Sequence, residues 1–209
     1  MDHLQQLIER YPRLSAIQDD IRKAYSLLEE TFTARGKLLV AGNGGSSADA
    51  GHITGELMKG FVKKRPLPSS FISKLNEIDP SHAGYLGGAI QQGLPVIALP
   101  EQTALMTACL NDIDGDIIYA QQVYGYGSPG DVFLGISTSG NSKNIILAAI
   151  TAKAKNLKTI ALSGASGGAL AKYADAAIIV PEKETYKIQE LHLPVYHALC
   201  LMLEEHFFP

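Results

Sequence analysis

The N-terminal part of the chain has the spacing of an amphipathic helix. Between residues 14 and 34 apolar residues recur every three or four positions, which places them on one face of a helix. They are Leu14, Ile17, Ile21, Tyr25, Leu28 and Phe32. Gly36 interrupts the pattern, so residues 1–35 are expected to form a helical segment ahead of the main sheet.

Five short apolar runs follow, each typical of a strand that is covered on both faces. They are KLLVAG (37–42), PVIALP (95–100), DVFLGIS (131–137), KTIALSG (158–164) and AAIIVP (176–181). Helix-like segments separate the runs, and strands that alternate with helices pair in parallel through crossover connections. The sequence therefore predicts an α/β fold, a three-layer αβα sandwich with a five-stranded parallel sheet of the flavodoxin-like doubly wound type.

The end of the chain has the length and pattern of a long final helix. This predicted helix covers residues 185–207, TYKIQELHLPVYHALCLMLEEHF. Pro194 lies within it, removes one backbone hydrogen bond and favours a kink.

Residues 61–94 form an excursion between the first and second strands. Prolines interrupt it, and a helix is predicted around residues 80–92. One interpretation is a solvated surface loop. The other is a lid or subunit contact in which Lys63, Lys64 and Arg65 help to hold an anionic substrate.

Composition limits the classes of partner. The chain has 209 residues, 46% of them hydrophobic, which suits one domain over residues 1–209. Its net charge of -3 gives no basic field that would attract nucleic acid or an anionic membrane. Cys109 and Cys200 lie in apolar runs without metal or redox spacing, so buried free thiols in a reducing compartment are expected. No apolar stretch has the length of a membrane span or signal peptide, and we expect a cytoplasmic location.

Two loops after predicted strands have the composition of phosphate-binding turns. AGNGGSS (41–47) follows the first strand, and ISTSGNS (136–142) follows the third. Both offer glycine for close approach and hydroxyl groups as donors, at strand ends where helices begin. Ser47 stands where a dinucleotide fingerprint needs glycine, and no P-loop lysine follows, so nucleotide binding is not expected. For each loop alone, a helix-capping turn is the alternative.

Four polar side chains on two predicted helices suggest acid–base chemistry. His52 and Glu56 are four residues apart and share one helical face, and the last helix carries Gln189 and His197. Such a set suits aldose–ketose isomerisation, with Glu56 as the base at carbon and His197 moving a proton between oxygens. Packing in the core and metal chelation by His52 and Glu56 are the alternatives.

These motifs together resemble a known family. The series GNGGSxxDAxHxxxEL, STSGNSxN and IQExHxxxxH is that of the sugar isomerase (SIS) domain family, and within it of the phosphoheptose isomerases. The resemblance runs over nearly the whole chain in the same order, and only residues 61–94 look foreign. It implies a homotetramer with active sites at subunit interfaces, in which residues 1–35 contribute to oligomerisation. It also implies interconversion of sedoheptulose 7-phosphate and D-glycero-D-manno-heptose 7-phosphate.

The resemblance also implies residue roles. Glu56 and His197 match the proton-transfer pair. The phosphate and its loops match Asn43, Gly44, Ser46, Ser137, Thr138, Ser139 and Ser142, and further substrate contacts match Asn111, Asp112 and Gln189. One zinc ion per subunit is implied, held by His52, Glu56, Gln189 and His197. Gln189 and His197 are eight residues apart, about 12 Å along one helix, so either extended side chains and the Pro194 kink or another subunit must complete that set.

The sequence departs from the family pattern at two positions. Gln102 stands where an aspartate is usual, and an amide cannot act as an acid or base, so Glu101 is the alternative. Gly60 stands where an arginine is usual. These changes leave the exact sugar open.

Two other functions compete with the isomerase. A non-catalytic regulator or scaffold would keep the fold and the phosphate loops, like the relative that binds the bacterial replication initiator. A hydrolytic metalloenzyme would need an open zinc position and a separate base.

Overall fold

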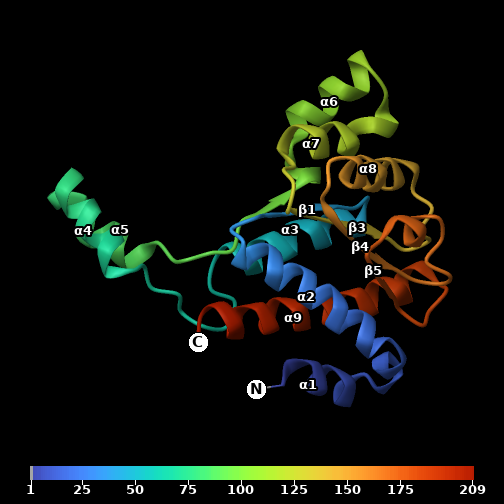
Figure 1. The fold of residues 1–209 in the computed structure, drawn as a ribbon, viewed down its shortest axis with the longest axis horizontal. Helices are drawn as coiled ribbons and strands as arrows, with labels where there is room; N and C mark the ends of the chain where they lie inside the picture. Colours follow the sequence, from blue (N-terminus) through green and yellow to red (C-terminus); the bar gives the residue numbers. More distant parts are fainter. Residues whose placement is uncertain (1) are drawn as a thin grey trace.

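The computed structural model describes residues 2–209 as a parallel sheet covered by helices on both faces, with one helical arm that stands away from the body (Figure 1). The strands are β1 (Leu38–Ala41), β2 (Val96–Ala98), β3 (Val132–Ser137), β4 (Lys158–Ser163) and β5 (Ala176–Ile179). The α-helices are α1 (His3–Arg10), α2 (Gln18–Thr33), α3 (Gly45–Met58), α4 (Ser69–Ile78), α5 (Pro80–Ala89), α6 (Thr103–Asp112), α7 (Ile118–Tyr126), α8 (Lys143–Ala154) and α9 (Thr185–Phe207).

The sheet has five strands in the order β2-β1-β3-β4-β5, all parallel. This is the flavodoxin-like doubly wound order, so the predicted fold is confirmed. From β1 the chain moves to one edge of the sheet, and from β3 it moves to the other. The carboxyl ends of β1 and β3 therefore flank the switch point, where open α/β sheets bind ligands.

Alternate strand residues face two separate cores. Val40 belongs to the core under α2, α3 and α9, whereas Leu39 and Ala41 belong to the core under α7 and α8. Strands β1 and β3 are buried along their whole length, as expected for runs without polar alternation. This packing places α3 and α9 on the same side of the sheet.

The N-terminal segment is less regular than the predicted helix over residues 14–34. It contains α1, a 3-10 helix over Pro12–Ile17 and then α2. Pro12 lacks a backbone N–H and restricts Tyr11 to non-helical angles, which separates α1 from the 3-10 helix.

One other prediction needs correction. The connection between β4 and β5 contains only a short 3-10 helix, Leu170–Tyr173, where a crossover helix was expected. The final helix has the predicted bounds, Thr185–Phe207, and continues through Pro194.

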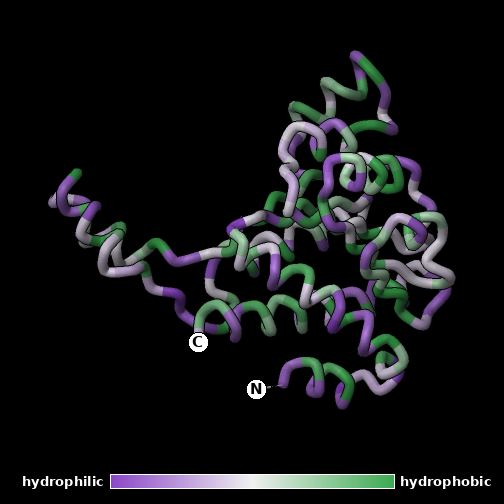
Figure 2. The backbone as a smooth tube through the Cα atoms, in the orientation of Figure 1, coloured by the Kyte–Doolittle hydropathy of each residue, from purple (hydrophilic) through white to green (hydrophobic). Residues whose placement is uncertain are grey.

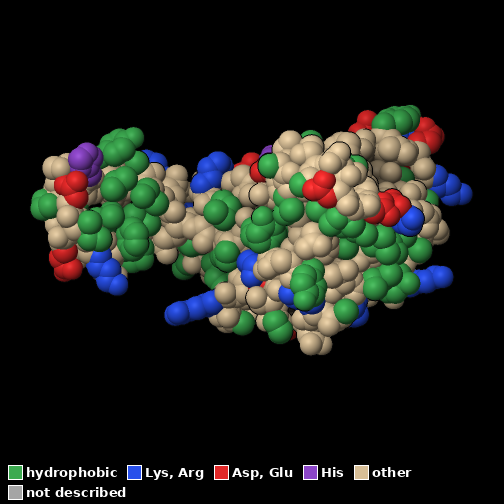
Figure 3. Space-filling view, turned by 90° about the horizontal axis from the view of Figure 1, so that it is seen from above, with side chains coloured by type: hydrophobic (Ala, Val, Ile, Leu, Met, Phe, Trp, Pro, Cys, Tyr) green, Lys and Arg blue, Asp and Glu red, His purple; other side chains and the backbone are tan. Residues whose placement is uncertain are grey.

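Helices α4 and α5 form the arm, defined as residues 69–89, and the sequence predicted only the second of them. The two helices pack on each other and project away from the sheet (Figure 1). Ala83 is the only buried residue within either of these helices, and Ile78 and Tyr85 are 82% and 77% exposed. Hydrophobic and hydrophilic residues mix along the arm (Figure 2), and apolar side chains gather on its surface (Figure 3).

Within residues 2–209, no helix combines the length and the hydropathy needed to cross a membrane.

Candidate active site

A pocket opens at the switch point between β1 and β3. It is lined by the loops after both strands and by the first turns of α9: Asn43, Gly44, Gly45, Ser46, Ile136, Ser137, Thr138, Ser142, Thr185 and Gln189. Three helices begin at this pocket, because α3 starts at Gly45, α8 follows Ser142 and α9 starts at Thr185. Helix N-termini carry free N–H groups and a partial positive charge, so the pocket has the electrostatics of a phosphate site.

Two glycines shape the first loop. Gly44 has a φ of +54°, in the region that favours glycine. A Cβ on Gly45 would lie 2.6 Å from Nε2 of Gln189, so the bare backbone lets the Gln189 side chain reach across the loop. Both glycines therefore fix the pocket rather than merely start a helix.

Hydroxyl groups line the other side of the pocket. Ser137 Oγ lies 3.0 Å from Ser142 Oγ, at the end of β3 and the N-cap of α8. Ser142 makes no side-chain capping bond to α8, so its hydroxyl is available to a ligand. Asn43 instead exchanges two amide hydrogen bonds with Asn144, at 2.9 and 3.0 Å, and so ties the first loop to the first turn of α8.

A second cluster lies further along the same two helices. Nε2 of His52 lies 3.1 Å from Oε1 of Glu56 and 3.5 Å from Nε2 of His197. Ser46 and Glu56 are ten residues apart on α3, and Gln189 and His197 are eight apart on α9. These offsets are about 15 Å and about 12 Å along the helix axes. The pocket and the cluster therefore lie at two different positions along the same two helices, α3 and α9.

Tyr196 and Asp49 hold the His52 ring. The buried Tyr196 hydroxyl donates to Oδ1 of Asp49 at 3.2 Å and lies 2.9 Å from Nδ1 of His52. Since its hydrogen goes to Asp49, the phenol oxygen accepts from Nδ1–H. In the tautomer with the hydrogen on Nδ1, Nε2 carries the lone pair, and this nitrogen faces Glu56 and His197.

Burial sets the protonation of the neighbouring groups. Burial lowers the pKa of His197, and the charges of His52 and Arg10 act in the same direction while Glu56 opposes them. His197 is therefore neutral near pH 7, able to take up and release a proton. Burial raises the pKa of Asp49, against the hydrogen bond from Tyr196 and the charge of His52.

Comparison with known proteins decides the family. A family model described as the SIS domain matches residues 82–164. The phosphoheptose isomerase of Helicobacter pylori (strain P12) is 36% identical over 194 residues, which cover 93% of this chain and 88% of that protein. The chain belongs to the phosphoheptose isomerase family. It is an isomerase with the SIS fold.

Two further family members agree with this assignment. The phosphoheptose isomerase of Sulfurimonas denitrificans is 41% identical over 172 residues, covering 82% of this chain and 75% of that protein. The solved structure of the phosphoheptose isomerase from Neisseria gonorrhoeae superposes with a TM-score of 0.75 at 30% identity, covering 97% of this chain and 95% of that one. The family therefore extends over the N-terminal helices and α9 as well as the sheet.

The structure brings together most of the residues that the family motifs predicted, but in two groups. The residues predicted to bind the phosphate line the pocket, apart from Ser139, whose hydroxyl accepts from the Asn141 backbone N–H at 3.1 Å. Asn111 and Asp112 lie exposed at the end of α6 and are not among the residues that line this pocket. Their contact with substrate stays a prediction.

The predicted zinc set is divided between the two groups. Gln189 lines the pocket, whereas His52, Glu56 and His197 form the cluster. No group of three or more His, Cys, Asp and Glu side chains in the described chain is arranged to hold a metal ion. Zinc stays a prediction.

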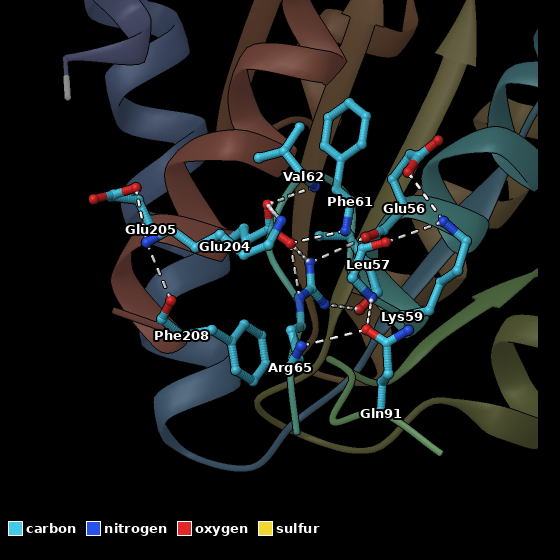
Figure 4. Close-up of polar contacts among 12 residues, drawn as sticks. Glu56, Leu57, Lys59, Phe61, Val62, Arg65, Gln91, Glu204, Glu205 and Phe208 are labelled. Carbon is cyan, nitrogen blue, oxygen red and sulfur yellow. Dashed lines mark hydrogen bonds and ion pairs between the residues drawn. The ribbon is translucent and has the colours of Figure 1, made fainter. Parts of the chain in front are cut away.

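The expected role of the KKR segment needs correction at Arg65. Its side chain is 0% exposed and paired with Glu204, so it cannot meet a substrate (Figure 4). Lys63 pairs with Glu205 at 3.0 Å, which leaves Lys64 as the exposed cation of the three. Glu204 and Glu205 of α9, which are distant in sequence, therefore determine which cations of the KKR segment are paired.

Several residues of the site were not among the predicted site residues. Tyr196, Asp49 and Phe61 touch the cluster, and Arg10 of α1 lines a separate hollow that includes His197. Thr185 lines the phosphate pocket. Asp49 is the aspartate of the motif GNGGSxxDAxHxxxEL, and Tyr196 directly precedes His197, so these two residues had a signal in the sequence.

Proposed function

We propose that this isomerase interconverts the ketose and aldose forms of a sugar phosphate, with sedoheptulose 7-phosphate and D-glycero-D-manno-heptose 7-phosphate as the substrate pair. The observation that carries the proposal is the contact of His52 Nε2 with both Glu56 and His197, on the helix pair that also builds the phosphate pocket. The names of the relatives, which are phosphoheptose isomerases, support a heptose phosphate as the substrate.

The separation between the phosphate pocket and the cluster of His52, Glu56 and His197 favours a long substrate. Pocket and cluster are offset by about 12–15 Å along α3 and α9, before side chains reach inward. An open-chain sugar with its phosphate on the far end can span from the serine loops toward Glu56. A triose phosphate is too short to do so.

The reaction needs two proton transfers. Glu56 takes a proton from C1 of the ketose, the C–H electrons form the C1–C2 double bond, and the carbonyl electrons move to O2. His197 takes the proton of the O1 hydroxyl and delivers it to O2, and Glu56 returns its proton to C2. The aldose results with no atom gained or lost. Positioned acid–base groups of this kind contribute about 10²–10⁴-fold each.

His52 supports the base. Its Nε2 lone pair faces Oε1 of Glu56 at 3.1 Å, so it can accept a hydrogen bond from Glu56 once that carboxylate is protonated. Tyr196 and Asp49 keep His52 in the tautomer that allows this.

We further propose that His52, Glu56 and His197 can bind zinc. Oε1 of Glu56 and Nε2 of His197 lie 3.1 and 3.5 Å from Nε2 of His52, so the three side chains are near one another, and they would reorient to hold the metal because they are not arranged as a metal site in the described chain. The hydrogen bond from His52 Nδ1 to a tyrosine–aspartate pair is the usual support for a ligating histidine. Bound zinc would stabilise negative charge on oxygen. Because it would use the lone pairs of Glu56 and His197, the proton transfers above are derived without it.

The homotetramer is also part of the proposal, with the sites at subunit interfaces. The arm supports assembly, because two ten-residue helices that bury only Ala83 are too short to be stable alone in water. Sedimentation equilibrium should give about 90 kDa, four times 22.4 kDa. A monomer at micromolar concentration would contradict the assembly.

A cytoplasmic location remains our expectation. It is supported by Cys109 and Cys200, which are both buried free thiols.

The direct test of function is conversion of sugar phosphates by the purified protein, followed by NMR. Sedoheptulose 7-phosphate should give the aldose, and six-carbon and three-carbon phosphates should react more slowly. Absence of conversion with every seven- and six-carbon phosphate, with and without added zinc, would overturn the proposal in favour of a binding regulator.

A further inference from the structure

A buried ion pair lies beside the proposed catalytic glutamate. The side chains of Arg65 and Glu204 are 0% and 1% exposed, and their closest atoms are 2.9 Å apart (Figure 4). The Arg65 guanidinium also lies 4.4 Å from the Phe208 ring centroid. The pair joins the turn after α3 to the last turn of α9.

The Glu204 side chain holds the turn after α3 through the backbone N–H groups of that turn. Its carboxylate accepts from the N–H groups of Phe61, Val62 and Lys63, at 2.8, 3.0 and 3.2 Å. The Phe61 ring in turn packs on the His197 ring, with centroids 5.3 Å apart. One carboxylate on α9 therefore fixes the residue that packs on the proposed proton shuttle.

Arg65 holds the end of α3. It donates from Nη1 to the Leu57 carbonyl at 2.8 Å and from Nη2 to the Glu56 carbonyl at 3.2 Å. The last carbonyls of a helix have no partner within the helix and carry partial negative charge, so a cation there is favoured. Arg65 thus anchors, through two backbone carbonyls, the helical turn from which the Glu56 side chain extends.

Stability alone does not account for this arrangement. Burying two charges costs several kcal/mol each, and apolar replacements of buried pairs are often neutral or stabilising. What apolar residues cannot supply is a fixed link among the end of α3, the 61–63 turn and α9. Such buried polar networks specify one geometry.

We propose that Arg65 and Glu204 are positioning residues that hold Glu56 and His197 in the relative positions that the reaction needs. This inference rests on the proposed isomerase function. The phosphate pocket lies at the opposite ends of α3 and α9, so loss of the link should lower kcat while leaving KM nearly unchanged.

The test compares R65K and E204Q with a matched control. R65K keeps the charge opposite Glu204 but cannot donate to both α3 carbonyls, and E204Q keeps an acceptor but removes the charge. The control is E205Q, which breaks the partly exposed Lys63–Glu205 ion pair one residue away. Activities are expressed per folded protein, measured by circular dichroism.

We expect kcat of R65K to fall at least about 10-fold with KM within about 3-fold, because small misplacements of reacting groups cost up to about 10²-fold. E204Q should fall further where it folds, and E205Q should match the wild type. Should folded R65K keep the wild-type kcat, the positioning role is wrong although the isomerase function stands. A wild-type protein without isomerase activity would instead remove the function and this role together.

Discussion

The Tyr196 hydroxyl lies 2.9 Å from Nδ1 of His52, and it donates a hydrogen bond to Asp49. Removal of the hydroxyl in Y196F frees His52 to adopt the other tautomer, with a hydrogen on the nitrogen that faces Glu56. Changes to such supporting groups cost about 10–100-fold in activity or metal affinity. Steady-state kinetics should show that loss mainly in kcat.

A matched variant separates the change of His52 tautomer from the general effect of removing a tyrosine hydroxyl. Tyr25 lies on α2, on a different helix from the cluster, and is also partly buried. Y25F should keep activity within about 2-fold. Equal losses in both variants would argue against tautomer control by Tyr196.

The phosphate pocket predicts different costs for two serines of one motif. Ser142 lines the pocket with a hydroxyl that does not cap α8, whereas Ser139 accepts from the Asn141 backbone. A hydrogen bond to a charged group contributes about 1.5–3 kcal/mol, so S142A should raise KM at least about 10-fold. S139A should raise KM less than about 3-fold. The reverse order would assign the phosphate to a different part of the loop.

The proposed zinc binding can be measured without reference to turnover. Titration calorimetry of the metal-free protein should show one zinc ion per chain. H52A should weaken that affinity at least about 10-fold, since a ligand is lost. H206A, which changes a histidine at the end of α9 that is not in the cluster, should bind as the wild type does. Unchanged affinity in H52A would place the metal elsewhere.

Buried His192 predicts a loss of stability in acid. It is 0% exposed, and burial lowers its pKa from 6.5 to about 4. Between these values the unfolded chain takes up a proton that the folded chain does not, so the free energy of unfolding falls as pH falls from about 6.5 to 4. The slope from this group is at most about 1.4 kcal/mol per pH unit.

Urea unfolding at pH 7 and pH 5 measures this contribution. H192L has a side chain of similar size and no titration, so its loss of stability between the two pH values should be smaller than in the wild type. An equal loss would show that other groups govern acid sensitivity.

Local pattern was enough to predict the sheet. Each strand is a continuous apolar run, and the parallel order follows from the alternation with helices. The two phosphate loops could be found because glycine and serine follow two strands at the edge of the sheet where helices begin. Prediction was weaker where geometry depends on distant partners.

Arg65 shows the limit most clearly. In the sequence KKRP it looks like a solvated cation, yet Glu204, 139 residues later, buries it. The separation of Gln189 from His197 followed from helix rise alone, whereas the link from Asp49 through Tyr196 to His52 required the packing of α3 on α9. The arm was missed in part because α4 buries no residue of its own, so no core pattern marks it.

The central claim, that Glu56 moves the carbon-bound proton, is tested most directly by solvent exchange. Wild-type protein and E56Q are incubated with sedoheptulose 7-phosphate in deuterated water, and NMR follows deuterium at C1 of the ketose and C2 of the aldose. The wild type should incorporate deuterium, and E56Q should do so at least about 100-fold more slowly while still binding the sugar. Exchange by E56Q at the wild-type rate would show that another group is the base.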